Sequence, residues 1–183
     1  MENQILDQEQ TSAQVLEYAS FWERVGASLV DFLIMLPVLA FNFYNLMQIK
    51  SLVLAIIFNF IFIIYKIYME GTFGATFGKK AMKIKVVTEN FQPIDLKLAL
   101  VRGCLYLLNA IVGTVSIIQV FNAAGFSDVT GFSEVSKFQN ANSSSIGLIL
   151  SLLILVSVIW VAFDRKKQAL HDKIAKTVCV KIV

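Results

Sequence analysis

The chain has 183 residues, of which 57% are hydrophobic and 16% are charged, and its formal net charge is +3. Soluble domains are roughly 45 to 50% apolar, so this composition excludes an ordinary soluble protein and indicates an integral membrane protein. We expect the lipid bilayer as its partner and no nucleic acid. The basic residues are clustered along the chain, which bears on orientation more than on binding partners.

Residues 1–18 are expected to form a mobile polar tail. The first 23 residues include five acidic side chains and no lysine or arginine, so they lack the positive start and short apolar core of a secretory signal. Tyr18, Phe21 and Trp22 have the amphipathic rings that mark a membrane interface just before a spanning helix. Residues 19–183 are predicted to form one transmembrane domain.

Residues 25–47 are the first predicted span, and an aspartate lies inside it. The run is long enough to cross a hydrocarbon core, which needs about 20 helical residues. One helical face carries two charges and two small residues at the spacing i, i+3, i+4, i+7: Arg24, Ala27, Ser28 and Asp31. A charge within a span is costly and must face protein or water, so Asp31 is the first candidate site residue.

Residues 52–68 are the second predicted span and form a helical hairpin with the first. Lys66 lies near the far end of this run, and Glu70 follows four residues later. These two side chains could pair along the helix, or Lys66 could extend toward the headgroups.

Residues 70–97 form a polar loop rich in lysine. Its three glycines are similar to a phosphate-binding loop, but the pattern G-x-x-x-x-G-K-S/T is missing and no strand precedes them, so nucleotide binding is not expected. Residues 82–87 alternate in the manner of a strand and are followed by a turn and a return through residues 91–94. This pattern predicts a β-hairpin.

Residues 98–121 are the third predicted span and contain Arg102. The loop at 122–145 repeats G-F-S-D-V-T as G-F-S-E-V-S, and its apolar residues recur at every third position, which predicts a short amphipathic segment on the membrane surface. Residues 146–163 are the fourth predicted span. The tail at 164–183 ends in an alternating stretch that is suited to add a strand to the hairpin.

Orientation follows from the basic residues, because cytoplasmic loops carry an excess of lysine and arginine. The loop at 70–97 and the tail at 164–183 hold most of them, which places both termini and this loop in the cytoplasm and the protein in the cytoplasmic (inner) membrane, with the 122–145 loop on the other side. The predicted fold is all-α and transmembrane, a four-helix membrane bundle with a small cytoplasmic β-hairpin or strand element. Six ionisable residues then gather toward the cytoplasmic half of the bundle: Arg24, Asp31, Lys66, Glu70, Arg102 and Asp164.

Catalysis and metal binding are not expected. Cys104 and Cys179 have neither the number nor the spacing of a disulfide framework or a zinc site, so both are interpreted as unpaired. His171 is the only histidine, and no second metal ligand or nucleophile accompanies it. We interpret it as a surface cap or as a contact that docks the tail to the spans, and expect no cofactor and no enzyme.

Three blocks in order resemble the RDD family of membrane proteins, which is named for one arginine and two aspartates. The first is A-S-F-W-E-R-V-G-A-S-L-V-D at residues 19–31. The second is T-F-G-K-K at residues 76–80, followed by Arg102, and it is similar to the family's T-L-G-K-R loop and downstream arginine. The third contains Q-A-L-H-D at residues 168–172 and is similar to the family's ending. This resemblance assigns a cytoplasmic motif to five residues: Thr76, Gly78, Lys79, His171 and Asp172.

The chain departs from the family pattern in its loops: the glycine that usually follows the lysines is replaced near residues 82–83, and the connection at 122–145 is longer than a minimal version needs. What the resemblance implies about function is transport, because members are suspected of it and sodium/proton antiport has been linked to some of them. In this interpretation the protein transports a small cation or solute, by proton coupling or sodium/proton exchange, and Asp31 accepts the cation or proton. Alternatively, the same charges lock the helices together in a structural or accessory subunit, as a homo-oligomer or part of a larger membrane complex.

Depth within the spans predicts the pairing of the charges. Asp31 lies about 9 Å inside its span at 1.5 Å per residue, too deep to stay ionised without a partner. Arg102 is on a helix that enters from the same side. We therefore predict that Asp31 pairs with Arg102 and that Arg24, at the rim, meets Asp164 or Asp172.

Overall fold

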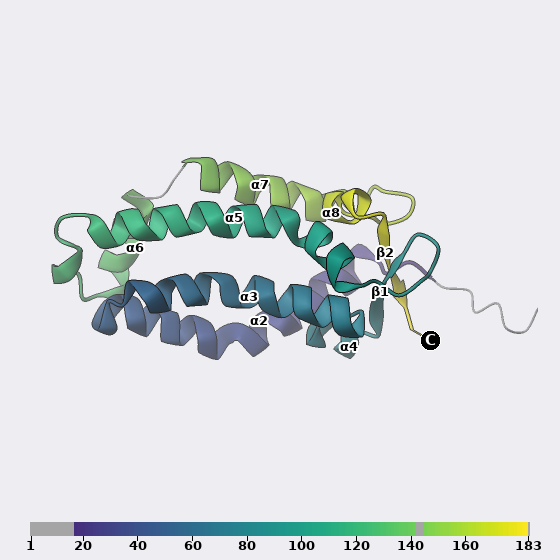
Figure 1. Cartoon of the computed structure of the whole chain (residues 1–183), viewed down its shortest axis with the longest axis horizontal. Coiled ribbons are helices and arrows are strands. Elements are labelled where there is room, and N and C mark those ends of the chain that lie inside the picture. The colour runs from purple at the N-terminus through teal and green to yellow at the C-terminus, as the bar shows by residue number, and fades with distance from the viewer. Residues whose placement is uncertain (1–16, 142–144, 183) are drawn as a thin grey trace, which may run out of the picture.

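Long helices run side by side in the protein, and a small assembly of short helices and strands closes one end (Figure 1). The computed structural model describes residues 17–141 and 145–182. Four helices follow the long axis: α2 (Phe21–Tyr44), α3 (Leu52–Phe73), α5 (Leu96–Asn122) and α7 (Ser145–Trp160). The end assembly, called the cap below, has four elements: α4 (Phe77–Ala81), β1 (Ile84–Thr88), α8 (Leu170–Ile174) and β2 (Thr177–Lys181). The first sixteen residues of the predicted tail lie outside the described residues.

Three described helices are long and apolar enough to cross a membrane: Phe21–Ile49, Leu52–Phe73 and Leu96–Asn122. The fourth, α7, has 16 residues, about 24 Å at 1.5 Å per residue, and reaches span length only together with α6 (Phe132–Ala141), from which it is bent by 99°. The predicted fourth span is therefore shorter than residues 146–163, because the chain turns at Val161. The prediction of an all-α membrane bundle is confirmed.

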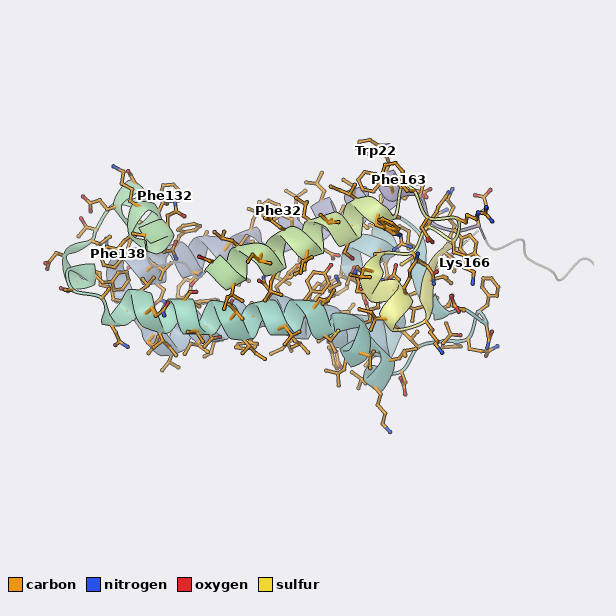
Figure 2. All side chains as sticks on the ribbon, turned by 90° about the horizontal axis from the view of Figure 1, so that it is seen from above. Trp22, Phe32, Phe132, Phe138, Phe163 and Lys166 are labelled. Carbon is orange, nitrogen blue, oxygen red and sulfur yellow. The ribbon has the colours of Figure 1, made fainter. Side chains whose placement is uncertain are left out.

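Apolar side chains project outward along the bundle, as lipid-facing residues do (Figure 2). Phe32 on α2 is 48% exposed, and Leu152 on α7 is 59% exposed. Such an apolar exterior would be a liability in water but suits a hydrocarbon solvent. Trp22 and Phe163 are also exposed and lie at the cap end, where aromatic rings are typical of a membrane interface.

The turn between α2 and α3 depends on one buried side chain. Asn45 begins the short π-helix η1 (Asn45–Ile49) and is fully buried. Its amide nitrogen donates to the carbonyl oxygen of Ser51 at 3.0 Å, and its amide oxygen accepts from the Ser51 N–H at 3.0 Å. This pair satisfies backbone groups that a helix end leaves free, so the hairpin of the first two spans closes without a long loop.

The cap contains a two-stranded sheet that confirms the predicted tail strand but not the predicted loop hairpin. β1 pairs antiparallel with β2, with Val86 opposite Cys179. The predicted hairpin within the loop is reduced to a single bridge between Val87 and Pro93. The physical reason is burial: residues 178–180 of β2 are almost fully buried against the cap, so the tail strand gains more by pairing with β1 than the short polar return can.

The opposite end is closed by the loop that follows α5. This loop contains the 3-10 turn η2 (Phe126–Asp128) and α6. Phe126 and Val135 are buried and pack with Leu46 and Val120 in one apolar cluster, while Phe132 is exposed. The segment is amphipathic and helical, as its spacing indicated, but much of its apolar face covers the end of the bundle.

Candidate functional site: a buried ion network beside two cavities

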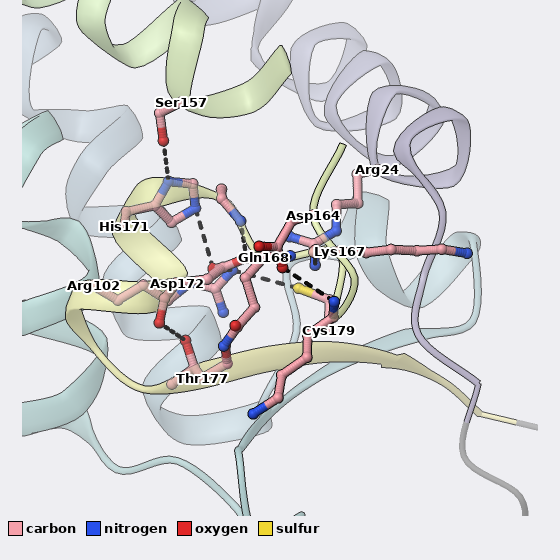
Figure 3. Close-up of polar contacts among 12 residues, drawn as sticks. Arg24, Arg102, Ser157, Asp164, Lys167, Gln168, His171, Asp172, Thr177 and Cys179 are labelled. Carbon is pink, nitrogen blue, oxygen red and sulfur yellow. Dashed lines mark hydrogen bonds and ion pairs between the residues drawn. The ribbon is translucent and has the colours of Figure 1, made fainter. Parts of the chain in front are cut away.

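Asp172 is the centre of a buried ion network in the cap (Figure 3). Its side chain is fully buried. Oδ2 accepts from Nη1 of Arg24 at 2.6 Å, and Oδ1 lies 2.7 Å from Nη2 of Arg102. Burial alone would raise the pKa of Asp172, but the charges of Arg102 and Arg24 hold it well below its usual range. One carboxylate of the tail therefore joins the first and third long helices.

A second branch of the network runs from Arg102 to the loop after α3. Oε2 of Glu70 lies 3.5 Å from Nε of Arg102, and Oε1 of Glu70 lies 2.6 Å from Nζ of Lys79. Glu70 and Arg102 are each 2% exposed. The charged groups alternate in sign along the series, an arrangement that compensates for their removal from water. The order is Lys79, Glu70, Arg102, Asp172 and Arg24.

Asp31 lies apart from this network, and the expected Asp31–Arg102 pair is wrong. Oδ1 of Asp31 accepts from the Tyr65 hydroxyl at 2.8 Å and from the Gly78 N–H at 2.8 Å. Oδ2 accepts from the Thr76 hydroxyl at 2.6 Å. Hydrogen bonds to an ionised carboxylate are about twice as strong as neutral ones, so these three donors satisfy Asp31 without a cation.

Gly78 is what brings α4 close enough to supply those donors. A Cβ atom at this position would lie 2.0 Å from the carbonyl oxygen of Ala27 and 2.7 Å from Cγ of Asp31. Thr76 is the N-cap of α4, and its hydroxyl also accepts from the Lys79 N–H. The close approach of α4 to α2 therefore depends on one missing side chain.

Asp164 organises the turn between α7 and α8 and does not contact Arg24. Oδ2 of Asp164 accepts from the N–H groups of Lys166 and Gln168, each at 3.1 Å, and its carboxylate pairs with Lys173. Lys173 lowers the pKa of Asp164 from its usual value. Of the two partners predicted for Arg24, the structure therefore shows Asp172. Nη2 of Arg24 also donates to the carbonyl oxygen of Lys167.

His171 docks α8 onto the long helices. Nδ1 of the ring lies 3.5 Å from the Ser157 hydroxyl of α7, and the ring meets Tyr106 of α5 edge to face at 5.5 Å between centroids. Burial lowers the pKa of His171 to about 3, against the attraction of Asp172 and with repulsion from Arg102. The ring is therefore neutral at pH 7.

Lys66 lies between the ion network and Asp31, and it makes neither of the contacts expected for it. Its Nζ lies 3.9 Å from the centroid of the Tyr106 ring, the distance of a cation–π contact. Within the described part of the chain Glu70 pairs with Lys79 and Arg102. The i,i+4 pair of Lys66 with Glu70 does not form there, and the lysine points toward protein.

Two cavities adjoin these groups inside the bundle. The first, here called the basic cavity, has a volume of about 160 Å³. Its lining residues are Arg24, Val25, Ser28, Lys66, Lys79, Arg102, Tyr106, Val158, Val161, Ala169 and His171. The second, the Asp31 cavity, has a volume of about 180 Å³ and is lined by Ala27, Ser28, Asp31, Phe62, Tyr65, Lys66, Thr76, Lys79 and Tyr106. Ser28, Lys66, Lys79 and Tyr106 belong to both linings.

Comparison with protein-family models identifies the family of this chain. The RDD family model matches residues 18–176, which is most of the sequence. The chain belongs to the RDD family. Searches of curated proteins and of solved structures returned no match. The arginine and the aspartates of the three blocks described above are thus the groups around which the cap of this RDD protein is assembled.

The structure sorts the eleven candidate residues into four groups. Arg24, Glu70, Lys79, Arg102 and Asp172 form the ion network. Asp31, Thr76 and Gly78 join α2 to α4, Lys66 borders both cavities, and Asp164 and His171 secure the tail. Within the described residues no group of three or more His, Cys, Asp or Glu side chains could hold a metal ion.

Sequence reasoning missed three residues that complete the site. The Tyr65 hydroxyl bonds Asp31, the Tyr106 ring contacts both Lys66 and His171, and Sγ of Cys179 lies 3.4 Å from Nη2 of Arg102. Tyr65 and Tyr106 lie within apolar spans, where a buried hydroxyl needs a partner, so that signal was available. Nothing in the sequence pointed to Cys179, which contacts Arg102 only because β2 folds back onto β1.

Proposed function

We propose that this RDD protein transports a small cation or solute across the membrane in a proton-coupled manner, or exchanges sodium for protons, and that Asp31 is its proton-accepting residue. The observation that carries the proposal is the position of Asp31, which lines a cavity inside the bundle that shares Lys66 and Lys79 with the basic cavity. An ionisable group on an internal cavity of a membrane bundle is typical of a proton or ion pathway.

The surroundings of Asp31 suit both of its charge states. Two of its three donors are hydroxyl groups, from Tyr65 and Thr76, and a hydroxyl can rotate to accept a hydrogen bond instead of donating one. A protonated Asp31 can therefore donate to either of these two hydroxyls, from which it accepts when ionised. A guanidinium partner, which has no acceptor, would not allow this exchange.

A flux measurement tests the proposal. Purified protein is reconstituted into vesicles loaded with a pH-sensitive dye, and a sodium or solute gradient is imposed. We expect a proton flux that Asp31→Asn abolishes. Asp128→Asn removes an exposed carboxylate at the far end of the bundle and serves as the matched control. Traces identical to those of empty vesicles, under every gradient, would exclude transport.

We also propose that the cap is cytoplasmic, in the inner membrane, with both termini on that side. The support is the cluster of basic residues in the cap and their scarcity at the other end, in line with the positive-inside tendency. Cysteines placed at exposed Lys83 and Ser127 test it with an impermeant maleimide. Labelling of Lys83→Cys in intact cells, with Ser127→Cys protected, would invert the orientation.

The alternative is an accessory subunit of a membrane complex or a homo-oligomer. The observation that favours it is that the ion network fixes α8 to α2 and α5 and fixes α4 to α3, a purely structural task. Mass determination of the protein in detergent and of any complex purified with it tests this alternative. A stoichiometric partner, combined with absent flux, would favour the accessory role.

A further inference from the structure

The basic cavity holds more positive charge than its surroundings neutralise. Four cationic side chains line it, and no carboxylate does so in the described part of the chain. Two carboxylates, Glu70 and Asp172, lie behind the cations and pair with three of them. His171 is neutral at pH 7, as argued above. Four cations facing two carboxylates leave a surplus of two charges, and even when Asp31 of the neighbouring cavity is counted, one remains.

Hydrogen-bond donors on this wall are also left without acceptors. Nη1 of Arg102 and Nε of Arg24 are buried and have no hydrogen-bond partner within the described residues, and Nε of Arg102 has only its ion pair with Glu70 at 3.5 Å. Arg102 as a whole is 2% exposed. An unsatisfied buried donor is costly, and more so on a charged group, so the two arginines that line the cavity keep donor capacity that an anion bound beside them could use.

Cys179 is the other group that could supply a negative charge. Burial would raise the pKa of its thiol, but Arg24, Lys79 and Arg102 lower it below its usual value. Its sulfur, however, approaches Nη2 of Arg102 and is not part of the cavity wall. A thiolate there would leave Nη1 of Arg102 without an acceptor and the ammonium of Lys66 without a paired carboxylate in the described part of the chain.

We propose that the basic cavity binds a phosphate-type oxyanion, either free in solution or carried by a lipid headgroup. Guanidinium groups match such oxygens with paired donors, and lysine adds a mobile positive charge. A volume near 160 Å³ holds several water molecules and so admits a five-atom oxyanion. Basic pockets between spanning helices are also where anionic headgroups bind. This site goes beyond the transport proposal, because binding requires no flux.

Lys66 is the residue to change, because it lines the cavity and no carboxylate is paired with it among the described contacts. Isothermal titration of the detergent-purified protein with inorganic phosphate, at constant ionic strength, gives the affinity. We expect Lys66→Met to weaken phosphate binding at least about 10-fold, the loss of one charge-assisted hydrogen bond, and Lys66→Arg to preserve it. Lys97→Met, an exposed lysine on α5, is the matched control.

A lipid arm distinguishes the two sources of the oxyanion. The same variants are placed in nanodiscs containing either phosphatidylcholine alone or an added phosphatidic acid, and bound lipid is counted by native mass spectrometry. Retention of phosphatidic acid that depends on Lys66, without binding of inorganic phosphate, assigns the site to a headgroup, and the reverse result assigns it to a free ion. Binding in neither arm, or equal losses in Lys66→Met and Lys97→Met, would overturn the proposal.

Discussion

Arg102 and Asp172 should be energetically coupled, and the size of this coupling energy follows from the burial of the two side chains. The two side chains are 2% and 0% exposed, with 2.7 Å between Nη2 and Oδ1. Removing one member of a buried pair leaves the other charge uncompensated, a loss of about 3 to 5 kcal/mol in soluble proteins. Asp172→Ala should lie at the upper end of that range, because it strands both Arg102 and Arg24.

The assay is a double-mutant cycle on the free energy of unfolding, measured by denaturant titration in mixed micelles. The double variant Arg102→Ala with Asp172→Ala should recover part of the loss, giving an interaction energy of about 1 to 3 kcal/mol. The cycle of Arg102 with Asp31 is the matched control. Because Asp31 is satisfied by Tyr65, Thr76 and Gly78, that cycle should be additive within about 0.5 kcal/mol.

The reverse pattern would refute the reasoning. Additive effects for Arg102 with Asp172, together with coupling between Arg102 and Asp31, would restore the pairing expected from depth alone. Additivity in both cycles would mean that the network contributes no pairwise stabilisation, and that its charges are held in place by the packing of α8 and β2.

Two further predictions concern the cap. Burial lowers the pKa of His171 from its usual 6.5 to about 3, so the unfolded chain binds a proton more readily than the folded one. The free energy of unfolding is therefore highest above pH 6.5 and decreases as the pH falls, by about 2 kcal/mol at pH 5. His171→Gln should remove that pH dependence from denaturant titrations at pH 7 and 5. Gly78→Ala should destabilise by about 3 kcal/mol in the same assay, because its Cβ would collide with the Ala27 carbonyl oxygen. Gly131→Ala, where the nearest atom is 3.8 Å away, should be nearly neutral, and equal losses at both glycines would contradict the close-approach argument.

Hydropathy and charge predicted the long helices of this molecule and the end of the bundle at which its charges gather. The apolar runs located the long helices to within a few residues, since span length and charge content are properties of local sequence. Depth along a span likewise indicated that Arg24, Glu70 and Arg102 belong near one end. The structure places them there, in one connected network.

The pairings could not be predicted, because they depend on how three distant segments meet. Asp31 and Arg102 lie on helices that enter from the same side, but the carboxylate is satisfied by α4, whose approach depends on Gly78. Arg102 was left for the tail, and Asp172 reaches it only because β2 pairs with β1. Periodicity describes a face of a helix, whereas the choice between two carboxylates depends on tertiary packing that overrides local pattern.

The two proposed sites should influence one another, since Lys66 and Lys79 line both cavities. With Asp31 ionised, its negative charge offsets part of the field of these lysines in the basic cavity. With Asp31 neutral that field is free, so an oxyanion in the basic cavity is held more tightly. Linkage requires the effect to be reciprocal. Asp31→Asn should therefore strengthen phosphate binding about 5-fold or more, within the usual range of coupling, and an unchanged affinity would separate the oxyanion site from the proposed proton site.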